Sequence, residues 1–262
     1  MEKNTIKKRG LSSSDARIIR QKGHDDALEF AKAIGMPSDY LNNHVAKKDV
    51  IDLSGDSHSV KSGNKKWQVF LYSLNRFETD HGFVFLNGMG EILANCIKSF
   101  PNSFEEYQKD KTLAKKKCMI AMRELCKRLQ DRKRVKAFIS KSMFNGGEVN
   151  YLTVKHNEQF HVFWNEDVID CFGNNFTVYN SKARNKNQFD DQKVIFKYNN
   201  LNIAELEMRN DSKIHYREIR FNMYKLRVME MLLTNIINTK QYSKNVILYG
   251  TSIKKFHKRK PI

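Results

Sequence analysis

Hydrophobic and polar positions divide the chain into a mainly helical first part and a second part with strand-like alternation. Apolar residues at helical spacing predict helices over residues 15–34, 91–100, 104–139 and 222–239. Strands are expected over 49–53, 57–61, 149–156, 159–165, 176–179, 194–198 and 201–210, while 65–74 fits a strand or a helix. We therefore predict an α/β (α+β) fold with two parts, 1–145 and 146–262, in one globular unit.

The charge of the chain indicates an anionic partner. Lys and Arg number 47 against 29 Asp and Glu, which gives a net charge of +18. The excess is spread along the sequence, and nucleic acid is the commonest polyanion that such proteins bind. A biased Lys- and Asn-rich composition is the alternative explanation, but it would usually raise Glu together with Lys. We expect a nucleic-acid-binding protein.

Cysteine spacing and hydropathy suggest an intracellular protein. The four cysteines form no CxxC pair, so we expect buried free thiols in a reducing cytosol rather than a zinc site. No apolar run approaches the roughly 20 residues of a membrane helix, and the N-terminus lacks the apolar core of a signal peptide. These patterns predict a cytoplasmic protein without a membrane segment.

A hairpin over residues 49–61 carries the candidate chemistry. Ser54-Gly55 reads as its two-residue turn, which would place Leu53 opposite Asp56. Side chains alternate between the faces of a strand, so Asp52 and Lys61 would then share a face. Asp56 would fall on the other face unless a bulge redirects it, although it is closer to Lys61 in the sequence. Both aspartates remain candidates.

These residue types suit the hydrolysis of a phosphodiester. Carboxylates from Asp52 and Asp56 could hold a divalent cation on the scissile phosphate, and the Lys61 ammonium could stabilise the developing charge. Gln68 could orient a phosphate or the attacking water. A surface hairpin with solvated charges is the competing interpretation of the same residues.

Three further acidic residues are candidates for the metal site. Glu29 lies beside the apolar stripe of the first predicted helix and could point towards the hairpin. Glu205 and Glu207 alternate with apolar residues, so both carboxylates should lie on one face of a strand. The competing interpretations are a solvated glutamate on the helix and a strand whose acids face Lys or Arg.

Several basic and amide side chains are candidates for contact with DNA. They lie beside the hairpin, on the basic helical region, in a basic loop over 181–191, and in a polar cluster that could read bases through Arg and Asn. The set comprises Lys65, Lys66, Arg123, Arg128, Lys182, Arg184, Arg209, Asn210, Arg217 and Arg220.

The hairpin and its surroundings resemble the PD-(D/E)xK nucleases, and among them the type II restriction endonucleases. The elements compared are Glu29 on a leading helix, Asp52 or Asp56 on one strand, and Ser59-Val60-Lys61 on the next. In length and charge the chain also resembles the enzymes of the HinfI type, which cut GANTC. It departs from the family at Ser59, where an acid is usual, so Glu29, Glu205 or Glu207 would have to replace that carboxylate.

The resemblance implies a mixed sheet flanked by helices, with a catalytic core over 1–145 and a recognition region over 146–262. It also implies Mg²⁺-dependent cleavage of double-stranded DNA at a short specific sequence, by a homodimer whose symmetry matches a palindromic site. Two alternatives remain, a repair or junction nuclease of the same fold and a non-catalytic DNA- or RNA-binding protein.

Overall fold

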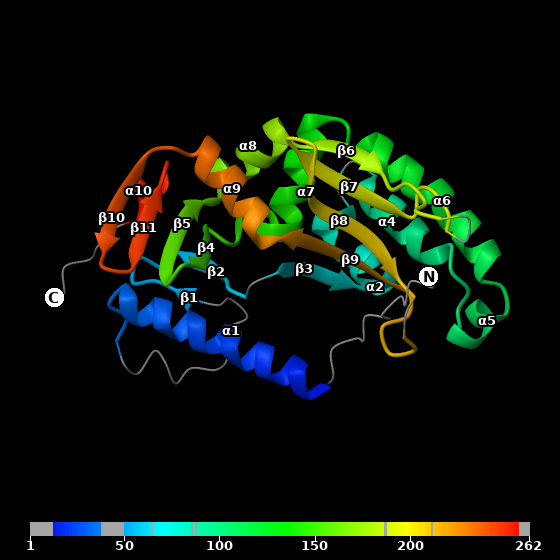
Figure 1. The fold of residues 1–262 in the computed structure, drawn as a ribbon, viewed down its shortest axis with the longest axis horizontal. Helices are drawn as coiled ribbons and strands as arrows, with labels where there is room; N and C mark the ends of the chain where they lie inside the picture. Colours follow the sequence, from blue (N-terminus) through cyan, green and yellow to red (C-terminus); the bar gives the residue numbers. More distant parts are fainter. Residues whose placement is uncertain are drawn as a thin grey trace, which may run out of the picture.

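Two β-sheets and the helices around them build the protein (Figure 1). The computed structural model describes residues 13–37, 50–63, 65–84, 86, 88–185, 188–210 and 212–256. One sheet is mixed and has the strand order β1-β2-β4-β5-β11-β10, and the other is antiparallel with the order β3-β9-β8-β7-β6. Helices flank both sheets, so the predicted α+β class is confirmed.

The elements follow one another with short connections. The helices are α1 (Ser13–Ala33), α2 (Leu74–Thr79), α3 (His81–Val84), α4 (Met89–Lys98), α5 (Phe104–Lys109), α6 (Lys111–Arg128), α7 (Arg132–Phe144), α8 (Asn165–Asn175), α9 (Lys225–Asn235) and α10 (Ser252–Lys255). The strands are β1 (Val50–Ile51), β2 (Ser57–Lys61), β3 (Lys66–Tyr72), β4 (Tyr151–His156), β5 (Gln159–Trp164), β6 (Thr177–Asn180), β7 (Lys193–Tyr198), β8 (Leu201–Arg209), β9 (Glu218–Tyr224), β10 (Thr239–Ser243) and β11 (Val246–Tyr249). Within the described ranges, no helix is both long and apolar enough to cross a membrane.

Helix α1 covers one face of the mixed sheet. Its apolar residues Ala27, Phe30 and Ala31 are buried against strand residues such as Tyr151 and Val162. The helix ends where Gly35 adopts a positive φ of 81°, a conformation that glycine reaches without strain. The apolar spacing that predicted this helix therefore also identified the face that packs on the sheet.

The antiparallel sheet buries one face and leaves the other facing a cavity. Phe196 and Phe221 point into the core, where the ring of Phe138 from α7 lies 5.2 Å from that of Phe221. Side chains at the alternate positions, including Lys193 and Glu205, line a cavity on the opposite side. The charged residues of this sheet are thus gathered on one face by strand alternation.

Both sheets combine strands from either side of residue 145. Strand β2 pairs with β4 in the mixed sheet, and β3 pairs with β9 in the antiparallel sheet. One hydrophobic cluster extends from Trp67 to Tyr249 and includes residues of both sheets. Residues 1–145 and 146–262 therefore both contribute strands to each sheet.

Two helical predictions need correction. The predicted helix over 104–139 is three helices, and the second and third begin where Asp110 and Asp131 accept hydrogen bonds from backbone amides of the first turn. The helix predicted over 222–239 begins only at Lys225, because Asn222 and Tyr224 still belong to β9. Its predicted end is also wrong, since Thr239 already belongs to β10.

Candidate functional site

The hairpin forms as predicted, but its register differs by one residue. Ile51 lies opposite Ser57, and the Asp52 amide donates to the carbonyl of Asp56 at 2.8 Å. The turn therefore has three residues, 53–55, and Gly55 has a φ of 89° that favours glycine. The expected pairing of Leu53 with Asp56 is wrong, because the chain closes between the two aspartates instead.

This register places the aspartates and Lys61 on opposite faces of the mixed sheet. Asp52 and Asp56 share a face with His58 and Val60, and Val60 packs in the core under α1. Lys61 is one residue further along β2, so its side chain leaves from the other face, together with that of Ser59. The expectation that Asp52 and Lys61 share a face is therefore wrong.

The Asp52 carboxylate is buried in a hydrogen-bonded loop. Its Oδ1 accepts from the amides of Ser54 and Asp56 at 2.8 and 3.1 Å, and its Oδ2 lies 3.4 Å from Nε2 of His58. Burial alone would raise the pKa of Asp52, but the hydrogen bonds from His58 and from the two amides hold that pKa below its ordinary value. These bonds shape the hairpin and occupy the carboxylate.

His58 is the centre of a small buried network. Its side chain is fully buried, its Nδ1 lies 3.0 Å from Oγ1 of Thr153, and its ring stacks on Tyr151 at 4.5 Å. Burial lowers the pKa of His58 despite the neighbouring aspartates, so the ring is neutral near pH 7. Tyr151 in turn donates to Oδ2 of Asp56 at 3.3 Å, which ties the second aspartate to the same network.

Glu29 lies away from the hairpin loop, in an ion-pair group with Lys155 at the end of β4. The Lys155 Nζ lies 2.7 Å from Glu29 Oε2 and 2.9 Å from Asp26 Oδ1. Burial alone would lower the pKa of Lys155, but the hydrogen bonds and charges of both acids raise it. Sequence reasoning missed Asp26, although its position three residues before Glu29 places both acids on one side of the helix.

The four carboxylates predicted to hold a metal lie in three separate places. Asp52 and Asp56 belong to the hairpin, Glu29 to α1 and Glu207 to β8. Among the residues that the structure describes, no group of three or more His, Cys, Asp or Glu side chains could hold a metal ion. These four residues therefore do not fit a shared Mg²⁺ site.

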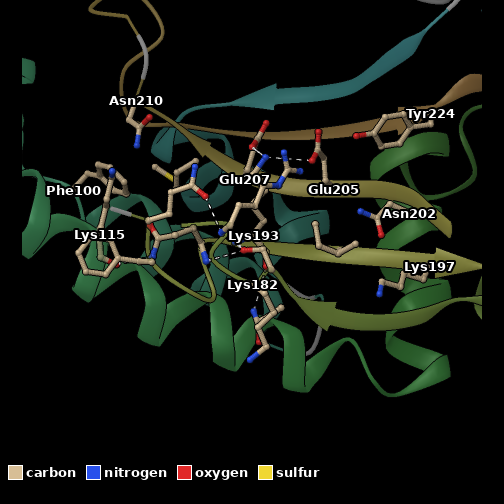
Figure 2. Close-up of a pocket in the computed structure, with 18 residues that line it drawn as sticks. Phe100, Lys115, Lys182, Lys193, Lys197, Asn202, Glu205, Glu207, Asn210 and Tyr224 are labelled. Atoms are coloured by element: carbon tan, nitrogen blue, oxygen red, sulfur yellow. Dashed lines mark hydrogen bonds and ion pairs between the residues drawn. The ribbon is translucent and has the colours of Figure 1, made fainter. Parts of the chain in front are cut away.

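A cavity of about 610 Å³ occupies the open face of the antiparallel sheet (Figure 2). Strands β7 and β8 form its floor, and its walls come from the segment that follows β6, from Phe100 after α4 and from Lys115 of α6. Five cations line it, against two carboxylates. The cations are Lys115, Lys182, Arg184, Lys193 and Lys197, and the carboxylates are those of Glu205 and Glu207.

A row of alternating charges crosses the floor of this cavity, and we call it the ion-pair ladder. It runs in the order Lys66, Glu205, Lys193, Glu207 and Arg220, and each residue pairs with the next. Burial alone would raise the pKa of Glu205, but the Lys66 hydrogen bond and the charge of Lys193 hold it below its ordinary value. The ladder has three cations and two carboxylates, so its net charge is positive.

The ladder shows the partners of the two strand glutamates. They lie on one face, as alternation predicted, and they face Lys and Arg, as the competing interpretation expected. Glu207 is bonded to both Lys193 and Arg220, which satisfies its two oxygens. It holds the floor of the cavity together.

The residues predicted to contact DNA are divided between this cavity and other surfaces. Lys182, Arg184 and Asn210 line the cavity. Lys66 and Arg220 belong to the ladder, and Gln68 is exposed on the same face, opposite Asn222. Lys65 is exposed immediately before β3, and Arg209 ends β8.

Three predicted arginines are bonded elsewhere. Arg123 Nε lies 2.5 Å from Asp191 Oδ2, and Arg128 pairs with Glu124 on its own helix. Arg217 donates to Asn102 at 2.8 Å beside a second cavity. Arg123 therefore anchors the end of the loop over 181–191 instead of presenting its whole guanidinium to solvent.

Sequence reasoning missed several residues of the cavity. Lys193, Lys197, Asn202 and Tyr224 line it. Lys193 directly precedes the strand predicted over 194–198 and is four residues before Lys197, an even spacing that places both on one face if the strand begins one residue earlier. Comparisons with family models, curated proteins and solved structures found no match to the chain.

Proposed function

We propose that the protein binds double-stranded DNA and cleaves it as a type II restriction endonuclease that depends on a divalent cation. The observation that carries the proposal is the basic cavity on the open face of the antiparallel sheet. Strand β3 of that sheet directly follows β2, the strand that carries Lys61. A homodimer belongs to the proposal, since two-fold symmetry matches a palindromic DNA site.

The charge of the cavity supports DNA as the ligand. Its five cations exceed its two carboxylates by three, in a chain whose net charge is +18. Cations placed along one face bind phosphates by releasing condensed counterions from DNA. Amide side chains such as Asn202 and Asn210 stand among these cations and could hydrogen-bond to bases.

The connection between the two sheets supports the choice of Lys61 as a catalytic candidate. Lys61 ends β2, and Lys66 begins β3 after only four intervening residues. Lys66 pairs with Glu205 on the floor of the cavity. A DNA molecule on the open face would therefore pass close to the end of β2, where an ammonium could stabilise charge at a phosphate.

An acidic residue that acts together with Lys61 should lie on the same face of the mixed sheet as the Lys61 side chain. Ile51 shares that face, because it pairs with Ser57 on β2. Asp49 lies outside the described residues, and it is a candidate because it precedes Ile51 by two positions in the sequence.

Digestion of plasmid DNA with Mg²⁺ tests the proposal. The wild-type protein should give discrete fragments, and mapping of their ends should return one short sequence. Lys61→Ala and Asp49→Asn should each lower the cleavage rate by about 100-fold or more, the usual scale for a group that stabilises transition-state charge. Lys240→Ala, an exposed lysine on the outermost strand β10, is the control and should cleave normally.

Two outcomes would contradict the proposal of a sequence-specific nuclease that uses Lys61. The first is a smear without discrete ends, and the second is unchanged cleavage by Lys61→Ala. A non-catalytic DNA-binding protein is the second candidate, favoured by the separation of the described carboxylates. A gel shift that shows DNA binding, together with no cleavage in the presence of any divalent cation, would support this second candidate.

A further inference from the structure

The shape of the cavity differs from that of a surface that reads intact duplex DNA. Proteins read a paired base step by inserting a convex element, such as a helix or a β-ribbon, into a groove. The open face of the antiparallel sheet is instead hollowed to about 610 Å³. A hollow in the protein suits a group that projects from the nucleic acid, such as a base that has left the stack.

The cavity is long, and each of its ends carries an aromatic residue, a lysine and an asparagine. Figure 2 shows Phe100, Lys115 and Asn210 at one end and Lys197, Asn202 and Tyr224 at the other, with Lys193 between them. A hollow of this form has room for consecutive nucleotides in an extended strand. The cations along its length match the phosphates of such a strand.

Aromatic rings lie within the cavity beside cations. The Phe189 ring lies 6.0 Å from Nζ of Lys115, whereas Lys66 at 4.4 Å and Arg227 at 4.8 Å already lie over the Tyr224 ring. Every base has a π-face, so exposed aromatic rings bind unstacked bases without regard to sequence. A ring with a neighbouring cation provides a surface for the base and a charge for the adjacent phosphate.

The ladder leaves selected groups available to a ligand. Glu205 and Glu207 are occupied by Lys66, Lys193 and Arg220, so they fix the floor. The side-chain amides of Asn202 and Asn210, by contrast, have no hydrogen-bond partner among the described residues. An amide offers both donors and an acceptor, which suits the Watson–Crick edge of an unpaired base.

We propose that this cavity binds unpaired nucleotides of a DNA strand, with at least one base stacked on Phe189 and the phosphates beside Lys182 and Lys197. The inference rests on the proposed function in one respect, because DNA must be the ligand. It goes further by assigning to the open face a preference for DNA whose bases are displaced from the duplex.

Fluorescence anisotropy with three DNA probes tests this assignment. The probes are a labelled single strand, the matching duplex, and the same duplex with two looped-out nucleotides, all without divalent cation. The protein should bind the looped-out duplex at least fivefold more tightly than the paired duplex. Replacement of a looped-out adenine by 2-aminopurine should give a fluorescence change on binding, because the base moves onto an aromatic ring.

Variants connect the preference to the cavity. Phe189→Ala and Asn202→Asp should each weaken binding to the single strand about tenfold, because one removes a stacking surface and the other adds a negative charge. Phe189→Tyr keeps the ring and should retain affinity. Lys240→Ala, on β10 at the far end of the molecule in Figure 1, should bind as the wild type does.

The outcomes separate this inference from the proposed function. Equal affinity for the paired and looped-out duplexes, or unchanged binding by both Phe189→Ala and Asn202→Asp, would overturn the inference and leave duplex binding intact. An absence of binding to every DNA probe at low salt would overturn both. Thermal unfolding of each variant confirms that a loss of affinity is not a loss of fold.

Discussion

Two pairs of acidic residues, Asp52 with Asp56 and Glu205 with Glu207, have opposite surroundings. The aspartates lie in a hairpin under α1, where backbone amides, His58 and Tyr151 are their partners. The glutamates lie on the open face of the antiparallel sheet, where three cations are theirs. Carboxylates that a helix covers thus hold a loop in place, whereas carboxylates on an open face contribute to the charge of a cavity.

The largest expected difference between the two pairs is in stability. Asp52→Ala removes a buried acceptor from two amides and from His58, so it should lower the free energy of unfolding by about 2–4 kcal/mol. Glu205→Gln should cost about 1 kcal/mol or less, because the lysines beside it keep 39% and 36% of their side-chain surface exposed to water. Urea denaturation measures both, and equal losses would contradict the comparison.

A second test uses pH. The folded-state pKa of His58 is lowered, so the unfolded chain binds a proton more readily and stability falls as pH drops below about 6.5, the ordinary value. The folded-state pKa of Asp52 is also lowered, which extends the loss below the ordinary aspartate value of 3.8. Thermal unfolding between pH 8 and pH 5 should therefore show a declining midpoint. His58→Gln should flatten that decline, while His24→Gln, at an exposed position of α1, should leave it unchanged.

The third test concerns DNA affinity. Lys197→Ala should weaken DNA binding about three- to tenfold and reduce the slope of log affinity against log salt by about 1, as the loss of one phosphate contact does. Glu207→Gln removes a negative charge from the same cavity and should strengthen binding. Asp52→Asn should change affinity little, because its carboxylate lies in the hairpin. Equal effects at all three positions would contradict the distinction between the cavity and the hairpin.

The smallest effect is expected at Glu29. Its side chain is 46% exposed and shares Lys155 with Asp26, so Glu29→Gln should cost no more than about 0.5 kcal/mol. Its effect on plasmid cleavage should stay within twofold, because its carboxylate is engaged with Lys155 rather than the hairpin. A 100-fold loss of cleavage would contradict this expectation and indicate that Glu29 belongs to the catalytic site.

Local pattern predicted much of the fold. Strand alternation located β4, β5 and β7, and it placed Glu205 and Glu207 on one face. Helical spacing located α1, and the composition of the loop after β6 identified Lys182 and Arg184, which line the cavity. These features depend only on residues that are near one another in the sequence.

The errors arise where distant or detailed geometry decides. Ser54-Gly55 indicates a turn but does not fix its length, and one additional turn residue moved Asp52 and Lys61 to opposite faces. Lys193 and Arg220 are brought to Glu207 by strand pairing across β7, β8 and β9, which the sequence alone does not specify. The apolar pattern after Asn222 fits a strand as well as a helix, which explains the misplaced start of α9.

Lysine footprinting with and without DNA tests most directly whether DNA binds on the open face. The protein is acetylated briefly at low salt, and each lysine is quantified by mass spectrometry. We predict that DNA protects Lys115, Lys182 and Lys197 from modification and leaves Lys240 and Lys254 unchanged, because only the first three line the cavity. Protection of Lys240 and Lys254, with the cavity lysines fully reactive in the presence of bound DNA, would contradict the account.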